Sequence, residues 1–166
     1  MDFYTHLLRP AFFKLDAEEA HELVMRALKI GSLFPGLIRA VSGAKPVTRP
    51  RTVAGIGFPN PIGLAAGMDK NGVALPAWEA LGFGFIEVGT ITALAQPGNP
   101  KPRLFRFPHQ QALINRLGFN NEGVEAVAAR LERLHASGRW PRIPVGLNIG
   151  KSRVTPAEKA PEDYLA

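Results

Sequence analysis

Hydrophobic positions divide the chain into two parts with different periodicity. Over the first 34 residues, apolar side chains recur three and four positions apart, as at Tyr4, Leu7, Leu8 and Ala11. That spacing places them on one face of a helix. After residue 52 the apolar residues come in short continuous runs that end in glycine or a polar residue and lead into helical patterns. The pattern therefore predicts N-terminal helices followed by an α/β domain.

The N-terminal part predicts two helices. Pro10 either kinks the first helix or belongs to the first turn of a helix that begins near Arg9. The second helix has Asp16 as its N-cap, Glu19 at the capping-box position and Gly31 as its stop. Cationic residues beside the apolar faces suit a helical hairpin that lies on a bilayer surface. The alternative is that both helices pack on their own domain, because any surface helix is amphipathic. The stripe of the second helix is Ala20, Leu23, Val24, Ala27 and Leu28.

Residues 35–52 predict a boundary between two regions. This segment is rich in proline, glycine and basic residues, which is typical of a linker. We therefore expect an amphipathic helical hairpin over 1–34, a linker over 35–52 and an α/β domain over 53–166.

The part after the linker alternates strands and helices. Three apolar runs have the continuous hydrophobicity of strands buried on both faces, and helical patterns follow the first two of them. This βαβαβ order favours a parallel sheet. The segment between residues 92 and 121 is too long for a plain connection and predicts an insertion over a site. We expect sheet strands at 62–67, 83–90 and 143–150, helices at 72–81 and 121–137, and insertion strands at 103–107 and 112–116.

Composition narrows the classes of function. The 166 residues suit one domain or part of a larger one, and the formal net charge of +6 suits anionic lipid, nucleic acid or an anionic substrate. Basic residues are spread along the chain without interleaved aromatics, so we expect no nucleic-acid partner. Cysteine is absent and the four histidines lie far apart, which predicts no metal site. No apolar stretch approaches 18 residues, so any membrane contact is expected to be peripheral.

The first candidate site follows the apolar run at 62–67. Small residues, Ala66 and Gly67, let a flat cofactor approach the backbone, and Lys70 can place a positive charge beside it. In parallel α/β folds, ligands bind at the carboxyl ends of strands. A tight turn with an exposed lysine explains the same spacing equally well.

The second candidate site is rich in amides. Asn115 lies close to Phe119, and amides match the edge of a urea-like ring while the phenyl group offers an apolar wall. Asn120 or Asn121 could instead cap the helix that follows. Asn148 ends a strand where its amide can reach the same site, or it is an ordinary turn residue.

These segments carry a family resemblance. The motifs AAGMDKNG, INRLGFNN and GLNIGK occur in this order, separated by GFGFIEVGTIT and PGNPKPRLFRFP. Together they resemble the membrane-associated, quinone-dependent class (class 2) of dihydroorotate dehydrogenase, from the DAEEAH helix onward. The resemblance implies a (β/α)8 TIM barrel with FMN, oxidising dihydroorotate to orotate in de novo pyrimidine (UMP) biosynthesis and passing electrons to a membrane quinone.

The resemblance also implies roles for individual residues. Lys70 would stabilise negative charge on the reduced flavin and meet the orotate carboxylate, and the Asn115 amide would hold the pyrimidine edge. From pattern alone, His21 is a residue at the edge of a helix face and Arg106 an exposed strand charge, but both match positions near the quinone. The implied FMN contacts are Ala66, Gly67, Met68, Asp69, Lys70, Thr90 and Asn148; the implied substrate contacts are Lys70, Asn115, Arg116, Leu117, Gly118 and Phe119; the implied quinone contacts are His21 and Arg106.

In the family the catalytic base is a serine on a later loop, which would lie beyond Ala166. None of the serines at 32, 42, 137 and 152 matches that motif. A TIM barrel needs about 250 residues, so we expect only the first part of one here and no turnover by the isolated chain. The N-terminal helices imply a peripheral location on the cytoplasmic face of the cell membrane. Two alternatives stay open: a soluble-type FMN barrel oxidoreductase that uses fumarate or NAD, and a non-catalytic membrane-binding fragment.

Overall fold

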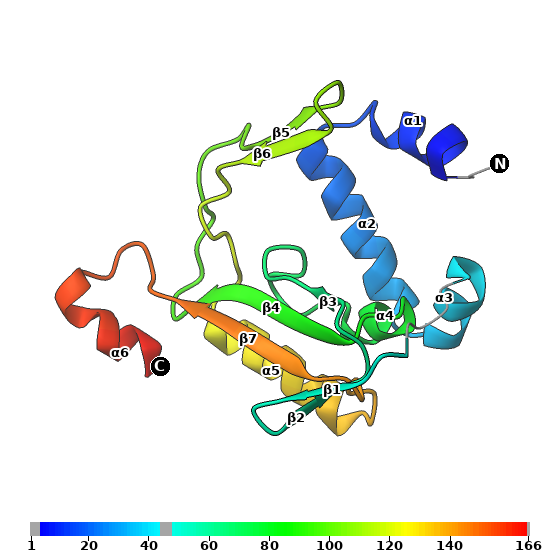
Figure 1. Cartoon of the computed structure of the whole chain (residues 1–166). Coiled ribbons are helices and arrows are strands. Elements are labelled where there is room, and N and C mark those ends of the chain that lie inside the picture. The colour runs from blue at the N-terminus through cyan, green and yellow to red at the C-terminus, as the bar shows by residue number, and fades with distance from the viewer. Residues whose placement is uncertain (1–3, 44–47, 166) are drawn as a thin grey trace.

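The computed structural model describes residues 4–43 and 48–165 (Figure 1). Helices open the chain, as predicted. A short π-helical segment, η1 (Tyr4–Leu8), continues into α1 (Arg9–Phe12), whose first turn holds Pro10. Proline is tolerated there because the first helical N–H groups have no partner in the helix. The α-helical part therefore begins at Arg9, as one of the two predicted alternatives has it, although a π-helical segment precedes it. Helix α2 (Ala17–Gly31) follows.

The capping box of α2 is confirmed. The Asp16 carboxylate accepts hydrogen bonds from the backbone N–H groups of Glu18 (2.8 Å) and Glu19 (3.4 Å), and the Glu19 carboxylate accepts one from the Asp16 N–H (3.3 Å). The buried face of α2 differs from the predicted stripe, however. Leu23 is 48% exposed, whereas Glu18 is 5% exposed. Helix α2 thus turns a different face toward the rest of the protein than hydrophobicity predicted, and a charged residue lies on that buried face.

The linker predicted over 35–52 is wrong in part. Helix α3 (Pro35–Ser42) occupies its first half, with Pro35 in the first turn and Gly43 in the left-handed conformation (φ 60°) at its end. Ile38 of this helix packs against the core, which explains why a segment rich in proline and glycine is helical. Residues 44–47 of the predicted linker lie outside the described residues, and strand β1 (Arg51–Val53) already begins within its last residues.

A parallel sheet forms the centre of the fold. Its strands are β3 (Gly63–Leu64), β4 (Phe85–Thr92) and β7 (Val145–Gly150), in the spatial order β3-β4-β7. Helix α4 (Leu75–Ala80) connects the first two, and α5 (Val124–Ala136) precedes the third and lies along the sheet (Figure 1). The βαβαβ order and the mixed α/β class are thus confirmed.

The core lies between the sheet and its helices. Ile86 and Val88 of β4 pack with Leu75 of α4 and Val127 of α5, and all four are almost fully buried. Burial of both faces is confirmed for β4 but is wrong for β7, where Gly146, Leu147 and Ile149 are exposed. The exposed apolar side chains of β7 remain so because no described segment packs over them. They are Leu147 and Ile149, at 53% and 57% exposure.

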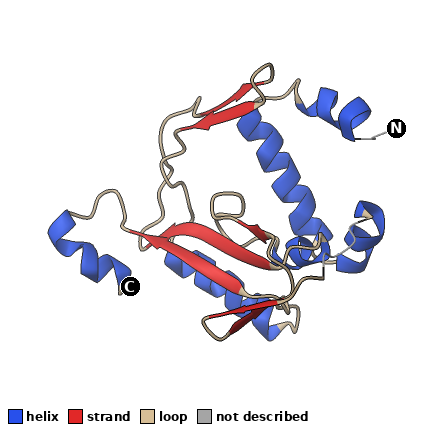
Figure 2. Cartoon of the chain, viewed as in Figure 1, coloured by secondary structure: helices blue, strands red, loops and turns tan. Residues whose placement is uncertain are grey.

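Two antiparallel hairpins flank the sheet. The first pairs β1 with β2 (Ile56–Phe58), and the second pairs β5 (Leu104–Phe107) with β6 (Ala112–Asn115). The second hairpin is the predicted insertion and lies beside the start of α2, at the end of two long loops (Figure 2). Backbone hydrogen bonds of 3.0 Å in both directions between Gln96 and Asn121 tie these loops together. The chain closes with η2 (Ala157–Lys159) and α6 (Ala160–Tyr164).

Candidate functional site

One cavity of about 1450 Å³ collects the residues that the sequence singled out. It lies between the loop after β3, the strands β4 and β7, the β5–β6 hairpin and helix α2. Small-molecule sites commonly occupy about 300–1,000 Å³, so this cavity has room for more than one ligand. Lys70 and Asn115 share it. Its lining includes Ala66, Gly67, Met68, Asp69, Lys70, Thr90, Asn148, Asn115, Arg116, Leu117, Gly118, Phe119, His21 and Arg106.

A buried carboxylate shapes the turn that carries Lys70. Asp69 is fully buried, and its two oxygens accept hydrogen bonds from the N–H groups of Val73 (2.8 Å) and Ala74 (2.9 Å) and from Trp78 Nε1 (3.0 Å). The carboxylate is thereby committed to the protein. Among the residues implied as FMN contacts, Asp69 can therefore meet a ligand only through its main chain, while its side chain fixes the position of Lys70.

The Lys70 ammonium is half-buried, and no carboxylate of the described residues forms an ion pair with it. Burial lowers the pKa of Lys70 from its ordinary value, while the charge of Glu18 opposes that shift. A partly desolvated cation without a partner favours binding of an anion. This geometry favours the ligand-binding interpretation of the turn over that of an exposed lysine.

A chain of polar side chains crosses the neighbouring strands. The Thr90 hydroxyl on β4 donates to Asn148 Oδ1 on β7, and Asn148 Nδ2 donates to Glu87 Oε1 (2.9 Å). Gly89 and Asn148 are register partners, so Thr90 and Asn148 lie on adjacent strands. The Asn148 amide is thus fixed in orientation and faces the cavity, and it is not simply a turn residue.

The amide-rich segment forms a lip, which we define as residues 115–119. The Asn115 carboxamide is exposed and makes no hydrogen bond within the described part of the chain. The main-chain carbonyls of the lip, by contrast, are held. Asn99 donates to the carbonyls of Arg116 (2.7 Å) and Leu117 (3.0 Å), and Gln96 Nε2 donates to those of Gly118 (3.3 Å) and Phe119 (3.1 Å). The lip therefore has a fixed backbone and an available amide.

Asn121 serves as a brace, not as the helix cap. The N-cap of α5 is Gly123, without a side-chain cap. The Asn121 amide is buried; its oxygen accepts from the N–H groups of Thr92 (3.2 Å) and Gly123 (2.8 Å), and its nitrogen donates to Thr92 Oγ1 and the Phe119 carbonyl. It fastens the end of the lip to strand β4.

The N-terminal side of the cavity is built around His21 and Arg106. Burial, and then the charge of Lys70, lower the pKa of His21, so its imidazole is neutral at neutral pH. Arg106 is not simply an exposed strand charge. Its guanidinium donates to the carbonyls of Phe12 (3.2 Å) and Leu15 (2.9 Å) and lies 5.0 Å from the ring centre of Phe13. The Arg106 side chain therefore holds the end of α1 and the residues that follow it, 12–15, against β5.

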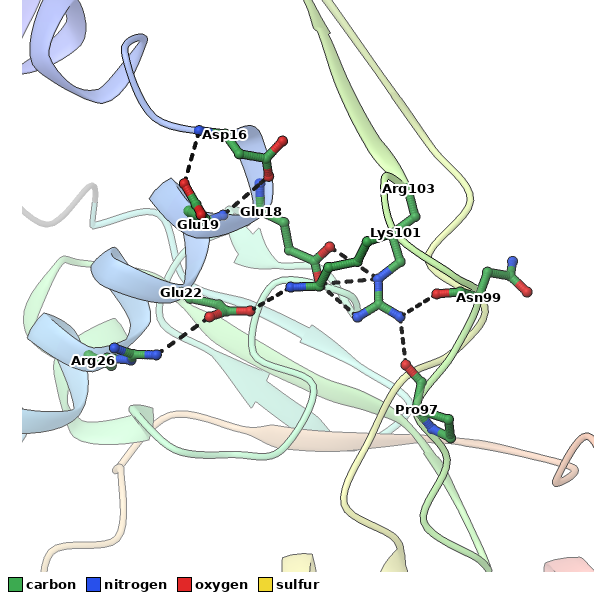
Figure 3. Close-up of polar contacts among 9 residues, drawn as sticks. All are labelled: Asp16, Glu18, Glu19, Glu22, Arg26, Pro97, Asn99, Lys101 and Arg103. Atoms are coloured by element: carbon green, nitrogen blue, oxygen red, sulfur yellow. Dashed lines mark hydrogen bonds and ion pairs between the residues drawn. The ribbon is translucent and has the colours of Figure 1, made fainter.

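Sequence reasoning missed the ion pair between Glu18 and Arg103. Both side chains are buried, and Arg103 Nη2 lies 2.7 Å from Glu18 Oε1 (Figure 3). Motif spacing could not reveal a pair separated by 85 positions. In the sequence, the pair is visible only as one acidic and one basic residue far apart, and nothing there indicates that they meet.

The fold and the cavity define an α/β protein whose candidate ligand site lies near the carboxyl ends of parallel strands. The family model for dihydroorotate dehydrogenase matches residues 50–166, and the chain belongs to this family. A dihydroorotate dehydrogenase (quinone) from Chloroflexus aurantiacus is 54% identical over 99% of this chain and 46% of the relative. One from Salinispora arenicola is 53% identical over 97% of this chain and 48% of that relative.

Solved structures give the same family. A crystal structure of DHODH from Eimeria tenella in complex with ferulenol matches with a TM-score of 0.72 and 38% identity over 90% of this chain and 39% of that one. A ligand-free structure from the same organism matches with a TM-score of 0.69. The chain spans about half the length of the curated relatives it matches.

Proposed function

We propose that the protein oxidises dihydroorotate to orotate in de novo pyrimidine biosynthesis, with FMN as its carrier and a membrane quinone as the electron acceptor. One observation carries the proposal: Lys70 and Asn115 line the same cavity, and within residues 4–43 and 48–165 neither the ammonium of Lys70 nor the carboxamide of Asn115 has a side-chain partner. Relatives named dihydroorotate dehydrogenase (quinone), alike over nearly the whole chain, support it.

The residues around Lys70 fit FMN. Gly67 has a φ of 105°, and a Cβ atom placed there would meet no atom within 4 Å, so open space lies directly beside the main chain. A flat ring can approach the backbone at such a position. Ala66, Gly67, Met68, Asp69, Lys70, Thr90 and Asn148 line the same cavity and would hold it. FMN supplies a two-electron carrier between the two substrates.

The chain's own side chains bind and orient the substrate. Lys70 neutralises the orotate carboxylate and the charge that develops on reduction, and its partial desolvation strengthens both effects. The Asn115 carboxamide offers a donor and an acceptor to the ring edge. Phe119, 63% exposed within the lip, covers the substrate and excludes water. Because the lip backbone is held by Gln96 and Asn99, the substrate is oriented without reorganisation of the main chain.

The N-terminal helices are the proposed contact with quinone and membrane. His21 and Arg106 line the same cavity as Lys70, so a quinone bound beside them would share that cavity with the carrier. No helix among the described residues is both long and apolar enough to cross a bilayer. Large apolar side chains are nevertheless exposed among cations in the predicted hairpin, residues 1–34, which suits a hairpin resting on the cytoplasmic face of the cell membrane. They are Tyr4, Leu7, Phe13, Leu23, Ile30, Leu33 and Phe34, and the cations of the same segment are Arg9, Lys14, Arg26 and Lys29.

The proposed architecture of the whole protein is a (β/α)8 barrel, of which the parallel strands β3, β4 and β7 form part. The base would be a serine outside this chain, as the family resemblance implies. The isolated 166 residues are accordingly expected to form no orotate. Orotate formation by this chain alone would overturn that expectation.

The decisive test uses the product of the complete gene. We expect the purified protein to contain flavin and to reduce a soluble quinone analogue when dihydroorotate is supplied. Lys70→Ala should lower kcat/KM for dihydroorotate by about 100-fold or more. The variant loses the one cation that both binds the substrate carboxylate and stabilises the charge developing on reduction. Lys159→Ala, at an exposed position, is the matched control and should leave the rate unchanged. A colourless, inert wild-type preparation would refute the proposal.

A further inference from the structure

A buried ion pair joins α2 to the loop that leads into β5. Arg103 Nε lies 3.1 Å from both carboxylate oxygens of Glu18, and Nη2 lies 2.7 Å from Oε1 (Figure 3). The side chains of the pair are 8% and 7% exposed. Hydrogen bonding to each other lowers the pKa of Glu18 and raises the pKa of Arg103, so both are charged at neutral pH.

The remaining donors of Arg103 hold the loop that supports the lip. Nη1 donates to the carbonyls of Pro97 and Asn99 (2.8 Å for the latter). Asn99 in turn donates to the carbonyls of Arg116 and Leu117, and the Arg116 N–H donates to the Arg103 carbonyl (2.8 Å). One guanidinium therefore fixes the backbone that presents the substrate-facing lip.

The other end of the pair fixes the rotation of α2. Glu18 and His21 are three positions apart, so they project from the same face of the helix. When Glu18 is held by Arg103, His21 is turned toward the cavity that it shares with Lys70. The pair thus connects the proposed quinone side of the cavity with the proposed substrate side.

Stability alone is a weak reason for such a pair. Burying two charges costs desolvation free energy that their attraction roughly offsets, and apolar replacements are often as stable. Fixing a unique arrangement of two segments is the better-supported use of a buried pair with bidentate geometry.

We propose that Glu18 and Arg103 are positioning residues that hold α2 at a fixed spacing from the lip. This spacing allows quinone and dihydroorotate to bind at two ends of one cavity. This inference rests on the proposed function. It assigns the pair no contact with either substrate. Loss of the pair releases α2 and impairs the quinone side first, because the lip keeps its contacts with Asn99 and Gln96.

The test compares Glu18→Gln with Glu22→Gln in the product of the complete gene. Glu22 lies on the same helix and pairs with Lys101 (3.3 Å) and Arg26 (3.5 Å). Lys101 also lies 3.4 Å from Glu18 Oε1, but the hydrogen bonds between Glu18 and Arg103 do not involve Glu22. Glu18→Gln should raise the KM for quinone about tenfold, while the anaerobic rate of flavin bleaching by dihydroorotate stays within about twofold. Glu22→Gln should change neither quantity, because exposed pairs contribute little.

Amide hydrogen exchange gives a readout that is independent of turnover. Glu18→Gln should speed exchange about tenfold in α2 and leave α5 unchanged, because a local release exposes only the released helix. Arg103→Lys should speed exchange in α2 in the same way and also raise the KM for dihydroorotate, because it removes the contacts with Pro97 and Asn99 as well. If Glu18→Gln does not fold, Arg103→Lys is sufficient to test the proposal.

Two results would overturn the inference while leaving the proposed function intact. In the first, the wild type turns over and Glu18→Gln changes neither the quinone KM nor exchange in α2. In the second, exchange rises equally in α2 and α5 and both half-reactions slow together, which is general destabilisation. A wild type that does not oxidise dihydroorotate would instead refute the proposed function.

Discussion

Replacing Asp69 with asparagine tests how the turn that carries Lys70 is held. The carboxylate accepts three hydrogen bonds: from the N–H groups of Val73 at 2.8 Å and Ala74 at 2.9 Å, and from Trp78 Nε1 at 3.0 Å. Asparagine has one oxygen. Turned toward Ala74 and Trp78, that oxygen keeps two of the bonds, and the amide NH2 then faces the Val73 N–H. The variant loses one bond and gains a donor–donor contact in the interior.

The magnitude follows from those contacts. A hydrogen bond to a charged group contributes about 1.5–3 kcal/mol, and a buried donor left without a partner adds to the loss. We therefore expect Asp69→Asn to lower the free energy of unfolding by about 2–4 kcal/mol. Urea denaturation of the complete gene product, followed by circular dichroism, measures this change. Flavin affinity should fall as well, because Lys70 is the next residue.

A matched control is available at Glu79. Its Oε1 accepts a hydrogen bond from the exposed N–H of Arg142 (3.0 Å), and glutamine retains that acceptor. Glu79→Gln should change the free energy of unfolding by less than about 0.5 kcal/mol. If Asp69→Asn is equally mild, the carboxylate does not hold the turn and the account of the Lys70 position is refuted.

Three further predictions concern the two ends of the cavity. Asn115→Ala should raise the KM for dihydroorotate about tenfold without changing the melting temperature, because the carboxamide has no partner within the described protein; equal KM values in steady-state kinetics would contradict its role. Removal of residues 1–34 should abolish quinone reduction but spare dihydroorotate-driven reduction of a soluble dye, whereas intact quinone reduction would indicate a soluble-type enzyme. Burial, and then the charge of Lys70, lower the pKa of His21 in the folded protein. As the pH falls below about 6.5, the unfolded chain therefore binds more protons than the folded protein, and the free energy of unfolding decreases. Urea midpoints from pH about 8 to about 5 should therefore fall less for His21→Gln than for the wild type, and parallel curves would contradict this.

Hydrophobic pattern was sufficient for the elements that pack around the sheet. The continuous apolar run of β4 and the helical spacing of α5 each reflect a face in the core, so both were predicted near their observed bounds. Pattern failed for α3, because proline and glycine mask a helix whose Ile38 is anchored by tertiary contact. Local composition at α3 indicates a linker, but the packing of Ile38 against the core stabilises a helix there.

The residues that line the candidate site were predicted from the sequence. The contacts that hold those residues in place were not. Lys70 and Asn115 stand in recognisable motifs, and the structure brings them to one cavity. The buried face of α2 could not be predicted, because the Glu18 carboxylate is stabilised there by Arg103, which lies 85 positions away, and by its neighbour Lys101. Hydrophobicity ranks Leu23 above Glu18 for burial, and a distant partner reverses that order.

Titration of the complete gene product with orotate, followed by the absorption spectrum of its bound flavin, tests the central claim most directly. If the turn at Lys70 and the lip at Asn115 bound a flavin and a pyrimidine in one cavity, orotate would shift the flavin spectrum saturably. The account predicts that shift in the wild type, with a dissociation constant raised about tenfold in Lys70→Met, because the carboxylate loses its cation. A preparation without flavin, or a flavin spectrum indifferent to orotate, would contradict it.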